Sequence, residues 1–425
     1  MSGSDLAKLM PETELKTLIV SECTRCHTLS RIGVIGRSPD QWRATIEKMR
    51  HNPYNKTMRA DEEDGANLTD EQATKIVDYL AKNFGPGLAW DSERDFPKAW
   101  IRGDASKYMI TEYDLPSGSE PHDLAVDSKG IGWVGEDAHG VIGRFDPQTL
   151  AYTRISIPQA AGVAKKPQPH GVAVGPQDRV WVTDHSAGRI VQYDPETQQF
   201  TFYPIPKPSK GKPTVNTMAF KPDGTVWMTE SGADQILRLN LATKTFDEFP
   251  VPTSVRAQIK VDPYGMAVDG AGWLWFAEEN WTNKVGRVAP KSGEITEYSV
   301  PVPEQRPKLK RMASDVDGNI WFASWGEDHK LVKVDYRTTK MATFPTPTKY
   351  SGTYSVDVDR KRNLIWVSEY VADQLARFDP RTNRYVEYPL FGRGNLIRKI
   401  AVDPSGRVWF SGSKVDRIGY LDVIE

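Results

Sequence analysis

The sequence predicts two domains of different class, a small all-α domain followed by an all-β, seven-bladed β-propeller. Helix-capping signals and apolar residues at helical spacing are confined to the first part of the 425-residue chain. In the rest of the chain, a tryptophan recurs in short strand-like segments with a period of about 45 residues, which is typical of propeller blades.

Charge and hydropathy exclude some classes of function. The chain has 55 Lys and Arg against 56 Asp and Glu, so its formal net charge is -1. This balance argues against a nucleic-acid partner held by a basic surface. No run of about 18 apolar residues occurs, so we expect no membrane span. The segment Met1 to Asp5 lacks the basic and apolar regions of a signal peptide.

The most specific motif is Cys23-Thr24-Arg25-Cys26-His27, the C-x-x-C-H pattern of covalent c-type haem attachment. Two thiols at this spacing can form thioethers to the two vinyl groups of a haem, and the next imidazole can then bind the iron. A C-x-x-C pair can also be a dithiol redox pair or half of a zinc site. No second Cys or His cluster at ligand spacing is present, and the flanking segments are typical of helices, so we favour haem.

Three helices are predicted around this motif. The first carries an apolar stripe that leads into Cys23. The second begins at the capping box Ser38 to Gln41, with Pro39 at its first position. The third begins at the capping box Thr69 to Gln72 and ends at Phe84-Gly85-Pro86.

A helix, a C-x-x-C-H motif, a loop and a final amphipathic helix together resemble the class I cytochrome c fold. The resemblance covers about residues 8–88, and we assign residues 1–88 to such a domain. It implies one covalent haem c per chain, attached to Cys23 and Cys26, with His27 on the iron. It also implies a periplasmic or otherwise exported protein whose signal peptide has been removed, because this attachment takes place outside the bacterial cytoplasm.

The second axial ligand of that family is usually a methionine in the loop before the last helix. This favours Met58, which follows a polar, proline-containing loop. Met49 is the alternative, although its helical spacing with Trp42 and Ile46 is also explained by core packing. His51 is a third candidate. A methionine ligand would raise the haem potential, which suits an electron acceptor.

The repeat in residues 108–425 predicts seven blades of four short strands. Its markers are Trp133, Trp181, Trp227, Trp275, Trp321, Trp366 and Trp409. The last unit stops after its third strand, around Ile418 to Leu421. The segment at residues 108–116 matches a fourth strand, so we expect it to pair there and close the ring, which also removes exposed sheet edges.

The repeat unit resembles the virginiamycin B lyase family of seven-bladed propellers, also called streptogramin lyases. The resemblance rests on W-[FV]-x-[ED] and I-G-R-[IF] patterns, such as Trp275 to Glu278 and Val141 to Asp146, and covers roughly residues 108–425. It predicts the fold, whereas function depends on the site.

A candidate site lies at one rim of the propeller. The slot at the start of each inner strand holds His122, His170, Asn216, Tyr264, Lys310, Tyr354 and Arg398. The slot at the end of each second strand holds Glu136, Asp184, Glu230, Glu278, Ser324, Glu369 and Gly412. Both slots lie at the same rim because neighbouring strands are antiparallel. His122, His170, Glu136 and Asp184 are therefore the predicted catalytic residues, as an acid/base pair or as ligands of a divalent cation such as Mg or Ca. Each carboxylate can equally be a structural group that bonds a backbone.

The lyase family's site has a Pro-His pair in each of two successive blades and a Glu at the end of the following strand. Pro121-His122 and Pro169-His170 match the pairs, but Asp184 stands where the later Glu should be. In the alternative alignment, Glu120-Pro121-His122 and Glu136 match the second of the two successive blades. The blade before it then has Arg398 where the family has its other His. Neither register is complete.

Three functions follow from these resemblances. The first is an oxidoreductase, in which the propeller binds a small-molecule substrate or a redox partner protein and the haem domain carries electrons. The second is a metal-dependent lyase with an accessory cytochrome, and the third is a non-catalytic electron-transfer or docking protein. The linker at residues 89–107 contains Trp90, Phe96 and Trp100, so we expect the two domains to dock. In the oxidoreductase, the haem domain should lie over the rim. The alternative is that the aromatics anchor the linker to an outer blade, with the haem facing solvent and a separate partner.

Overall fold

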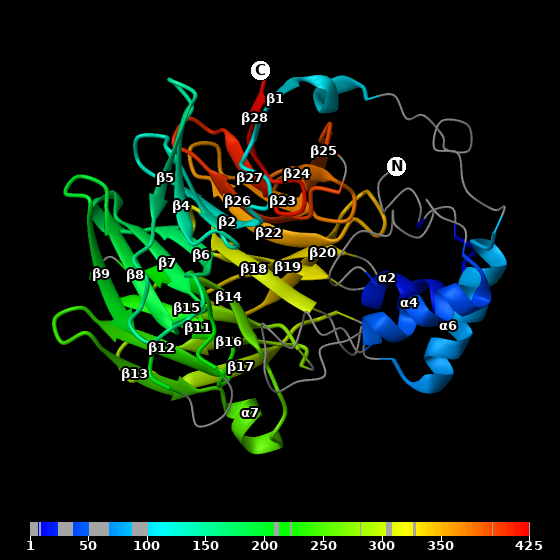
Figure 1. Ribbon diagram of the computed structural model, residues 1–425, viewed down its shortest axis with the longest axis horizontal. Coiled ribbons are helices and arrows are strands. Elements are labelled where there is room, and N and C mark those ends of the chain that lie inside the picture. The colour runs from blue at the N-terminus through cyan, green and yellow to red at the C-terminus, as the bar shows by residue number, and fades with distance from the viewer. Residues whose placement is uncertain are drawn as a thin grey trace.

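The structure is a computed structural model (Figure 1). It describes residues 7, 10–23, 37–50, 68–86, 101–207, 212–221, 223–280, 282–302, 308–325, 329–392 and 394–424. Several predicted features lie outside these residues, namely Cys26, His27, His51, Met58 and the linker aromatics Trp90, Phe96 and Trp100. Within the described ranges, no helix combines the length and the apolar character that crossing a membrane requires.

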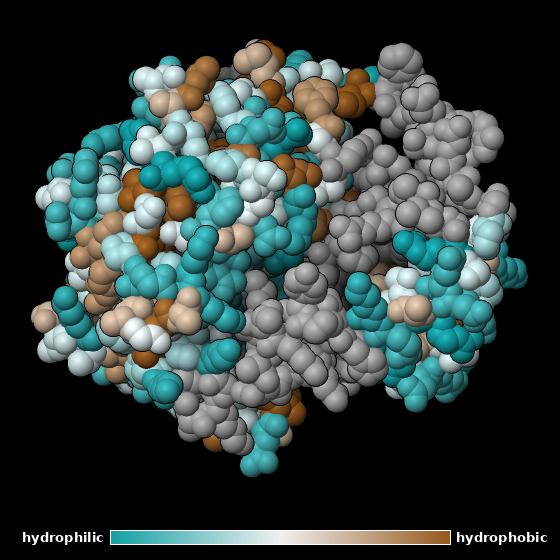
Figure 2. Space-filling model, in the orientation of Figure 1, coloured by the Kyte–Doolittle hydropathy of each residue, from teal (hydrophilic) through white to brown (hydrophobic). Residues whose placement is uncertain are grey.

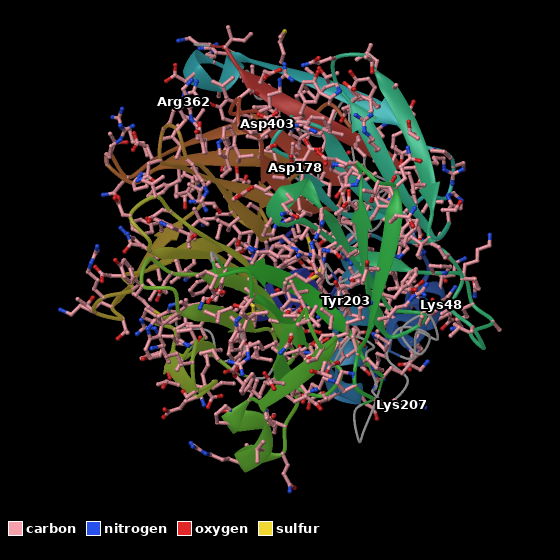
Figure 3. All side chains as sticks on the ribbon, turned by 90° about the vertical axis from the view of Figure 1, so that its left-hand side faces the viewer. Lys48, Asp178, Tyr203, Lys207, Arg362 and Asp403 are labelled. Atoms are coloured by element: carbon pink, nitrogen blue, oxygen red, sulfur yellow. The ribbon has the colours of Figure 1, made fainter. Side chains whose placement is uncertain are left out.

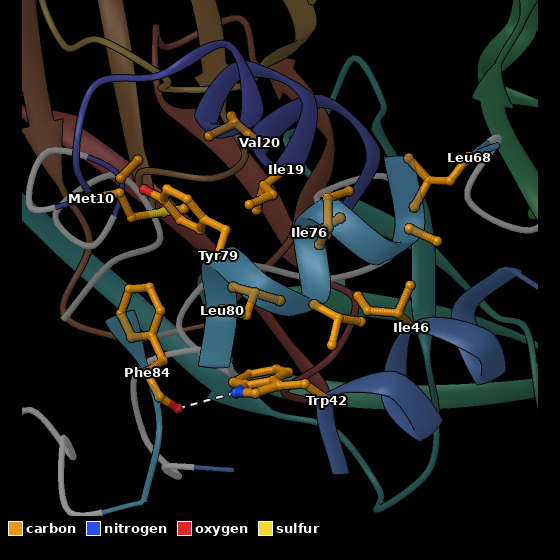
Figure 4. Close-up of a cluster of buried hydrophobic side chains, with 14 residues drawn as sticks. Met10, Ile19, Val20, Trp42, Ile46, Leu68, Ile76, Tyr79, Leu80 and Phe84 are labelled. Carbon is orange, nitrogen blue, oxygen red and sulfur yellow. Dashed lines mark hydrogen bonds between the residues drawn. The ribbon is translucent and has the colours of Figure 1, made fainter. Parts of the chain in front are cut away.

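The three predicted helices are present as α2 (Glu14–Cys23), α4 (Pro39–Arg50) and α6 (Asp70–Asn83). Reciprocal hydrogen bonds between Thr69 and Gln72 cap α6, as the capping-box pattern predicts. The helices share one hydrophobic core (Figure 4), in which the Trp42 indole donates a hydrogen bond of 3.1 Å to the Phe84 carbonyl. Cys23 is buried in this core. Met49 is partly buried against it, in agreement with a packing role.

The propeller consists of seven four-stranded sheets. Blade 1 is β2 (Pro121–Val126), β3 (Gly132–Glu136), β4 (Val141–Asp146) and β5 (Ala151–Ser156), and blade 2 is β6 (Pro169–Val174), β7 (Val180–Asp184), β8 (Arg189–Asp194) and β9 (Gln199–Pro204). Blade 3 is β10 (Val215–Phe220), β11 (Val226–Glu230), β12 (Gln235–Asn240) and β13 (Thr245–Pro250), and blade 4 is β14 (Pro263–Val268), β15 (Leu274–Glu278), β16 (Lys284–Val288) and β17 (Ile295–Ser299). Blade 5 is β18 (Lys308–Ser314), β19 (Ile320–Trp325), β20 (Lys330–Val334) and β21 (Met341–Pro345), and blade 6 is β22 (Thr353–Asp359), β23 (Leu364–Glu369), β24 (Gln374–Asp379) and β25 (Arg384–Pro389). Blade 7 is β26 (Ile397–Val402), β27 (Val408–Gly412), β28 (Arg417–Val423) and β1 (Tyr108–Asp114). Short helices lie at η1 (Gly103–Ser106), η2 (Pro176–Asp178) and α7 (Pro252–Ala257).

The ring closes as the sequence predicts. β1 pairs antiparallel with β28, with Tyr108 opposite Val423 and Asp114 opposite Arg417. The inner strand of every blade contacts the inner strands of both neighbours, including β26 of blade 7 with β2 of blade 1. The first strand of the propeller therefore covers the edge that the last strand would otherwise expose.

In blades 1, 4, 5 and 7, an aspartate six residues before the repeated tryptophan binds its indole nitrogen. In blade 4, the carboxylate of Asp269 accepts a hydrogen bond of 2.9 Å from Trp275 Nε1 and two more from turn amides. Asp403 binds Trp409 Nε1 in the same way in blade 7, at 3.0 Å, and Figure 3 labels this aspartate. The pair joins the turn after the inner strand to the blade core, where the indole is buried.

The helical region lies beside the propeller, on the side of β20 and β22 in Figure 1. Its described contact is with Tyr350, in the connection between β21 and β22. The ring of Tyr350 packs against the helical core, and Lys16 Nζ lies 4.8 Å from the ring centre. On the face shown in Figure 2, hydrophobic residues form small separate groups on the described surface.

Candidate functional site

Every inner strand of the propeller has a β-bulge at the rim positions. The strand pairing shifts between Pro121 and Leu124 in blade 1 and at the equivalent place in the six other blades. A bulge adds a residue to one strand and changes the direction of its side chains. Two consecutive residues of each inner strand therefore sit in the irregular segment, among them His122-Asp123, Lys310-Arg311 and Arg398-Lys399.

The two predicted histidines are brought together by these bulges. The ring centres of His122 and His170 are 3.6 Å apart, and those of His170 and His185 are 4.4 Å apart. His122 and His170 are only 7% and 8% exposed. The pair of Pro-His sequences thus marks a real juxtaposition of imidazoles from adjacent blades.

The contacts of His122 fix its protonation. Arg398 Nη1 lies 3.2 Å from His122 Nε2 and is a donor, so this nitrogen accepts. The proton is then on Nδ1, which donates to the Asp123 carboxylate at 2.9 Å. Burial, followed by the charges of Arg398 and Arg311, holds the pKa of His122 well below its usual value. His122 is therefore a neutral imidazole of defined tautomer.

His170 is neutral for a similar reason. Burial, then the neighbouring His122 and His185 rings, lowers its pKa well below the usual range. Its Nδ1 lies 4.0 Å from Asp137 Oδ1, and neither atom has a hydrogen-bond partner among the described residues. Burial raises the pKa of Asp137 to about 6. A ligand hydroxyl that reached both atoms would satisfy two buried polar groups at once.

An ion pair crosses the propeller axis next to the histidines. Arg311 Nη2 of blade 5 donates to Asp123 Oδ1 of blade 1 at 2.6 Å, and its Nε donates to the Arg398 carbonyl of blade 7 at 3.1 Å. Although burial opposes the charge, Asp123 raises the pKa of Arg311 above its usual value. On the same level, the hydroxyls of Tyr264 and Tyr354 are 2.6 Å apart. The axis is therefore bridged by side chains at the level of the bulges.

The other half of the rim is aromatic. Tyr264, Trp325, Tyr354 and Tyr370 form one buried cluster, with Tyr370 centred 5.2 Å from Trp325. The ammonium of Lys310 lies 4.8 Å from the ring centre of Tyr354. Imidazoles and carboxylates on one side thus face aromatic rings and cations on the other.

The predicted carboxylates point elsewhere. Glu136 accepts hydrogen bonds from Tyr152 and Arg154 of its own blade, at 2.8 Å and 2.7–2.9 Å. Asp184 binds the Gln168 amide at 3.0 Å and Arg189 at 2.9 Å. No hydrogen bond or ion pair joins either carboxylate to His122 or His170 in the described structure. Glu136 and Asp184 therefore have the structural role that the sequence left as an alternative, since they bind groups of their own blades. The carboxylates that lie beside the imidazoles are those of Asp123 and Asp137.

Sequence reasoning missed Asp123, Asp137, Arg311 and Lys399. It considered a single rim position in each strand, and each of these four residues directly follows such a position. One signal was present: Lys310-Arg311 and Arg398-Lys399 are consecutive charges inside otherwise apolar strands. Two adjacent charged residues in a buried strand indicate a bulge.

The described residues contain no group of three or more His, Cys, Asp or Glu arranged around one metal position. What they do offer is a neutral imidazole pair beside a carboxyl of raised pKa. The Asp137 carboxyl, with a pKa of about 6, can accept and donate a proton near neutral pH, whereas the two imidazoles remain neutral and offer hydrogen bonds. The positive side chains around them favour a ligand that carries or develops negative charge.

The protein is thus a seven-bladed β-propeller with a cluster of buried polar side chains on its axis. The model of the virginiamycin B lyase family matches residues 151–424, and the chain belongs to that family. No curated protein matches the chain.

Similar solved structures include a streptogramin B lyase, with 23% identity and a TM-score of 0.65 over 76% of this chain and 100% of that chain. Virginiamycin B lyase from Staphylococcus aureus has 21% identity and a TM-score of 0.64, over 75% and 100% of the two chains. Hydrazine synthase from Kuenenia stuttgartiensis has 12% identity and a TM-score of 0.59, over 73% and 97%. At these identities the likeness shows the fold alone.

Proposed function

We propose that the protein is an exported, haem c-dependent oxidoreductase, in which the rim of the propeller binds a small-molecule substrate and the helical region carries electrons to a redox partner protein. The observation that carries this proposal is the place where the helical region meets the propeller. Tyr350 lies in the β21–β22 connection, and the inner strand β22 starts a few residues later. The helices therefore contact the rim at which His122 and His170 also lie.

Aromatic side chains connect this contact to the rim histidines. Ring centres are 6.3 Å apart between Tyr350 and His329, 6.2 Å between His329 and Trp325, and 5.2 Å between Trp325 and Tyr370. The Arg398 guanidinium lies 5.9 Å from the Tyr370 ring centre and also contacts His122. Electron transfer slows steeply with distance, so a line of closely spaced rings favours transfer along it.

The haem-binding residues are those of the C-x-x-C-H motif. Cys23 ends α2 in the core of the helical region, a position that suits a thioether to a haem packed against that core. Cys26 and His27 follow it directly, with Met58 as the expected second ligand. The haem, when bound, supplies reversible one-electron storage.

At the rim, oxidation of a substrate releases protons as well as electrons. The Asp137 carboxyl beside His170, whose pKa burial raises to about 6, can accept the protons in turn and release them to solvent, and the Arg311–Asp123 pair holds His122 in place. The electrons leave towards the helical region and reduce the partner protein, which is the terminal acceptor. Each pair of electrons taken from substrate requires two one-electron transfers to that partner.

The second candidate is a lyase with an accessory cytochrome, and membership of the virginiamycin B lyase family favours it. The chain's own contacts favour oxidation instead. Glu120 pairs with Lys414 at 3.1 Å, Glu136 is held by Arg154, and Arg398 stands against His122. The carboxylates that match the family pattern are thus occupied by cations.

The test uses haem-loaded protein, a panel of small substrates and dichlorophenolindophenol as artificial acceptor. His122→Ala and His170→Ala should keep the haem spectrum and stop substrate-driven haem reduction, whereas the control His139→Ala should behave as wild type. Wild-type rates in both rim variants would exclude the rim as the site. Turnover that needs no acceptor would favour the lyase, and electron exchange with a partner but no substrate oxidation would favour a docking protein.

A further inference from the structure

Blade 4 contains a pair of adjacent carboxyl groups, one of which is completely buried. Glu278 ends β15, and none of its surface is exposed. After burial itself, the strongest influences on the pKa of Glu278 come from the side chains of Thr282 and Glu297, which lie next to it. Neither Oε1 nor Oε2 of Glu278 has a hydrogen-bond partner within the described parts of the chain. A buried carboxyl group in this state usually indicates a bound ion or a shared proton.

The same position at the end of the second strand has a donor in other blades. These donors are Arg154 for Glu136, Arg189 for Asp184, three backbone amides for Glu230, and Gln374 for Glu369. The strand register explains why blade 4 differs. Arg154 lies opposite Gly143 in the fourth strand of blade 1. Glu297 lies opposite Gly286 at the equivalent place in blade 4, so a second carboxylate stands where blade 1 has a guanidinium.

The neighbouring lysine does not replace the missing guanidinium. Lys284 begins β16, and its ammonium donates to Thr253 Oγ1 at 2.6 Å. No ion pair joins Lys284 to Glu278 or Glu297 in the described structure. The Thr253 amide donates to Glu297 Oε1 at 3.1 Å, which fixes one oxygen of that carboxylate with a neutral donor. The two carboxyl groups therefore have no cation bonded to them among the residues whose positions are described.

Neutral oxygen atoms lie close to the same pair. Thr282 is only 5% exposed, and its hydroxyl, which is adjacent to Glu278, has no hydrogen-bond partner in the described ranges. The next residue, Asn283, donates from Nδ2 to the Val300 carbonyl at 2.9 Å, and its Oδ1 is a further buried oxygen without a described donor. Carboxylate and hydroxyl oxygens are hard ligands of the kind that calcium and magnesium prefer.

The burial of these oxygens favours calcium over magnesium. Magnesium loses its water reluctantly and usually keeps several water ligands, whereas calcium accepts protein oxygens at about 2.3–2.6 Å in flexible geometry. The unpaired oxygens of Glu278 and Thr282 are closed to solvent, so a hydrated ion does not fit beside them. A bare calcium ion needs little more room than a shared proton, since neighbouring oxygens around it lie about 3–3.5 Å apart.

We propose that blade 4 binds a calcium ion, with Glu278 and Glu297 as its carboxylate ligands and the Thr282 hydroxyl as a neutral ligand. The ion takes the place that the Arg154 guanidinium has in blade 1 and ties the end of β15 to the outer strand β17. When no cation is bound, Glu278 holds a proton instead, because burial raises its pKa to about 8. The site is separate from the rim histidines and does not depend on the haem.

Calcium titration into the chelator-treated full-length protein tests the proposal, with thermal unfolding as a second readout. One ion should bind per chain, and calcium at 100 times its dissociation constant should raise the Tm by about 5 °C relative to EDTA. Magnesium should have a smaller effect. Glu278→Gln should lose both responses. The control Glu387→Gln should keep them, because Glu387 has the equivalent register in blade 6 but binds the amide and hydroxyl of Thr348.

Glu297→Arg separates loss of the site from loss of the fold, since it gives blade 4 the residue that blade 1 has. The new guanidinium should pair with Glu278, so this variant should melt in EDTA no lower than the wild type and should not respond to calcium. A wild-type chain that binds no calcium, with the same Tm in calcium and in EDTA, would overturn the proposal in favour of a shared proton. Unchanged calcium binding in Glu278→Gln and Glu297→Arg would overturn it as well, because the ion would then lie elsewhere.

Discussion

The cross-axis pair between Arg311 and Asp123 gives the sharpest prediction for stability. Both side chains are almost fully buried, and Asp123 Oδ1 accepts from Arg311 at 2.6 Å and from His122 at 2.9 Å. Arg311→Met leaves the carboxylate buried with His122 as its remaining side-chain partner. Removing one member of a buried pair costs about 3–5 kcal/mol. For a domain of this size, the expected fall in Tm is about 6–10 °C.

Thermal unfolding followed by near-UV circular dichroism measures this effect. The double variant Arg311→Met/Asp123→Asn should recover most of the lost stability, because no uncompensated charge remains. Arg381→Met is the control, since its pair with Asp379 is on the surface and the substitution should leave the free energy of unfolding nearly unchanged. The reasoning is refuted if Arg311→Met is as stable as this control, or if the double variant is less stable than Arg311→Met alone.

Three further predictions test the propeller. Burial raises the pKa of Glu278 to about 8, so the folded state binds a proton more tightly than the unfolded state, and the free energy of unfolding should fall as pH rises from about 5 to 8. Thermal melts at pH 6 and pH 8 measure this change, which Glu278→Gln should reduce. An equal change between the two pH values in wild type and variant would contradict the prediction. Asp269→Ala removes the acceptor of Trp275 Nε1 and of Arg287 and should lower the free energy of unfolding by about 2–4 kcal/mol in denaturant titrations. The control Asp223→Ala should lower it less, because the partners of Asp223 are on the surface. Similar losses in the two variants would contradict a stabilising role of the buried Asp269–Trp275 pair. Deletion of residues 1–116 removes β1 and should cause aggregation in size-exclusion chromatography, whereas deletion of residues 1–98 should leave a soluble propeller; a monomer from the longer deletion would count against closure by β1.

The architecture was predictable because its signals repeat. Each indole occupies the same slot in the second strand of its blade, and six of seven units repeat the complete strand pattern. The missing fourth strand of the last unit, with a matching segment at residues 108–116, was enough to predict the pairing of β1 with β28. The helices were predictable for a local reason, since their capping boxes act within four residues.

The site was predictable only in part. The repeated Pro-His sequence identified His122 and His170, but a bulge in every inner strand also brings the residue after the rim position, such as Asp123 or Arg311, into the site. Position at the rim also does not determine the direction of a side chain, so Glu136 was assigned to the histidines although Tyr152 and Arg154 bind it.

The central claim is that a covalent haem domain is docked on this propeller, and intact mass spectrometry tests it most directly. The chain should be produced by export in a host with the haem-attachment machinery. The account predicts a mass increase of one haem per chain, which the variant Cys23→Ala/Cys26→Ala abolishes while the propeller remains folded. A wild-type chain that is folded, exported and free of haem would contradict the account.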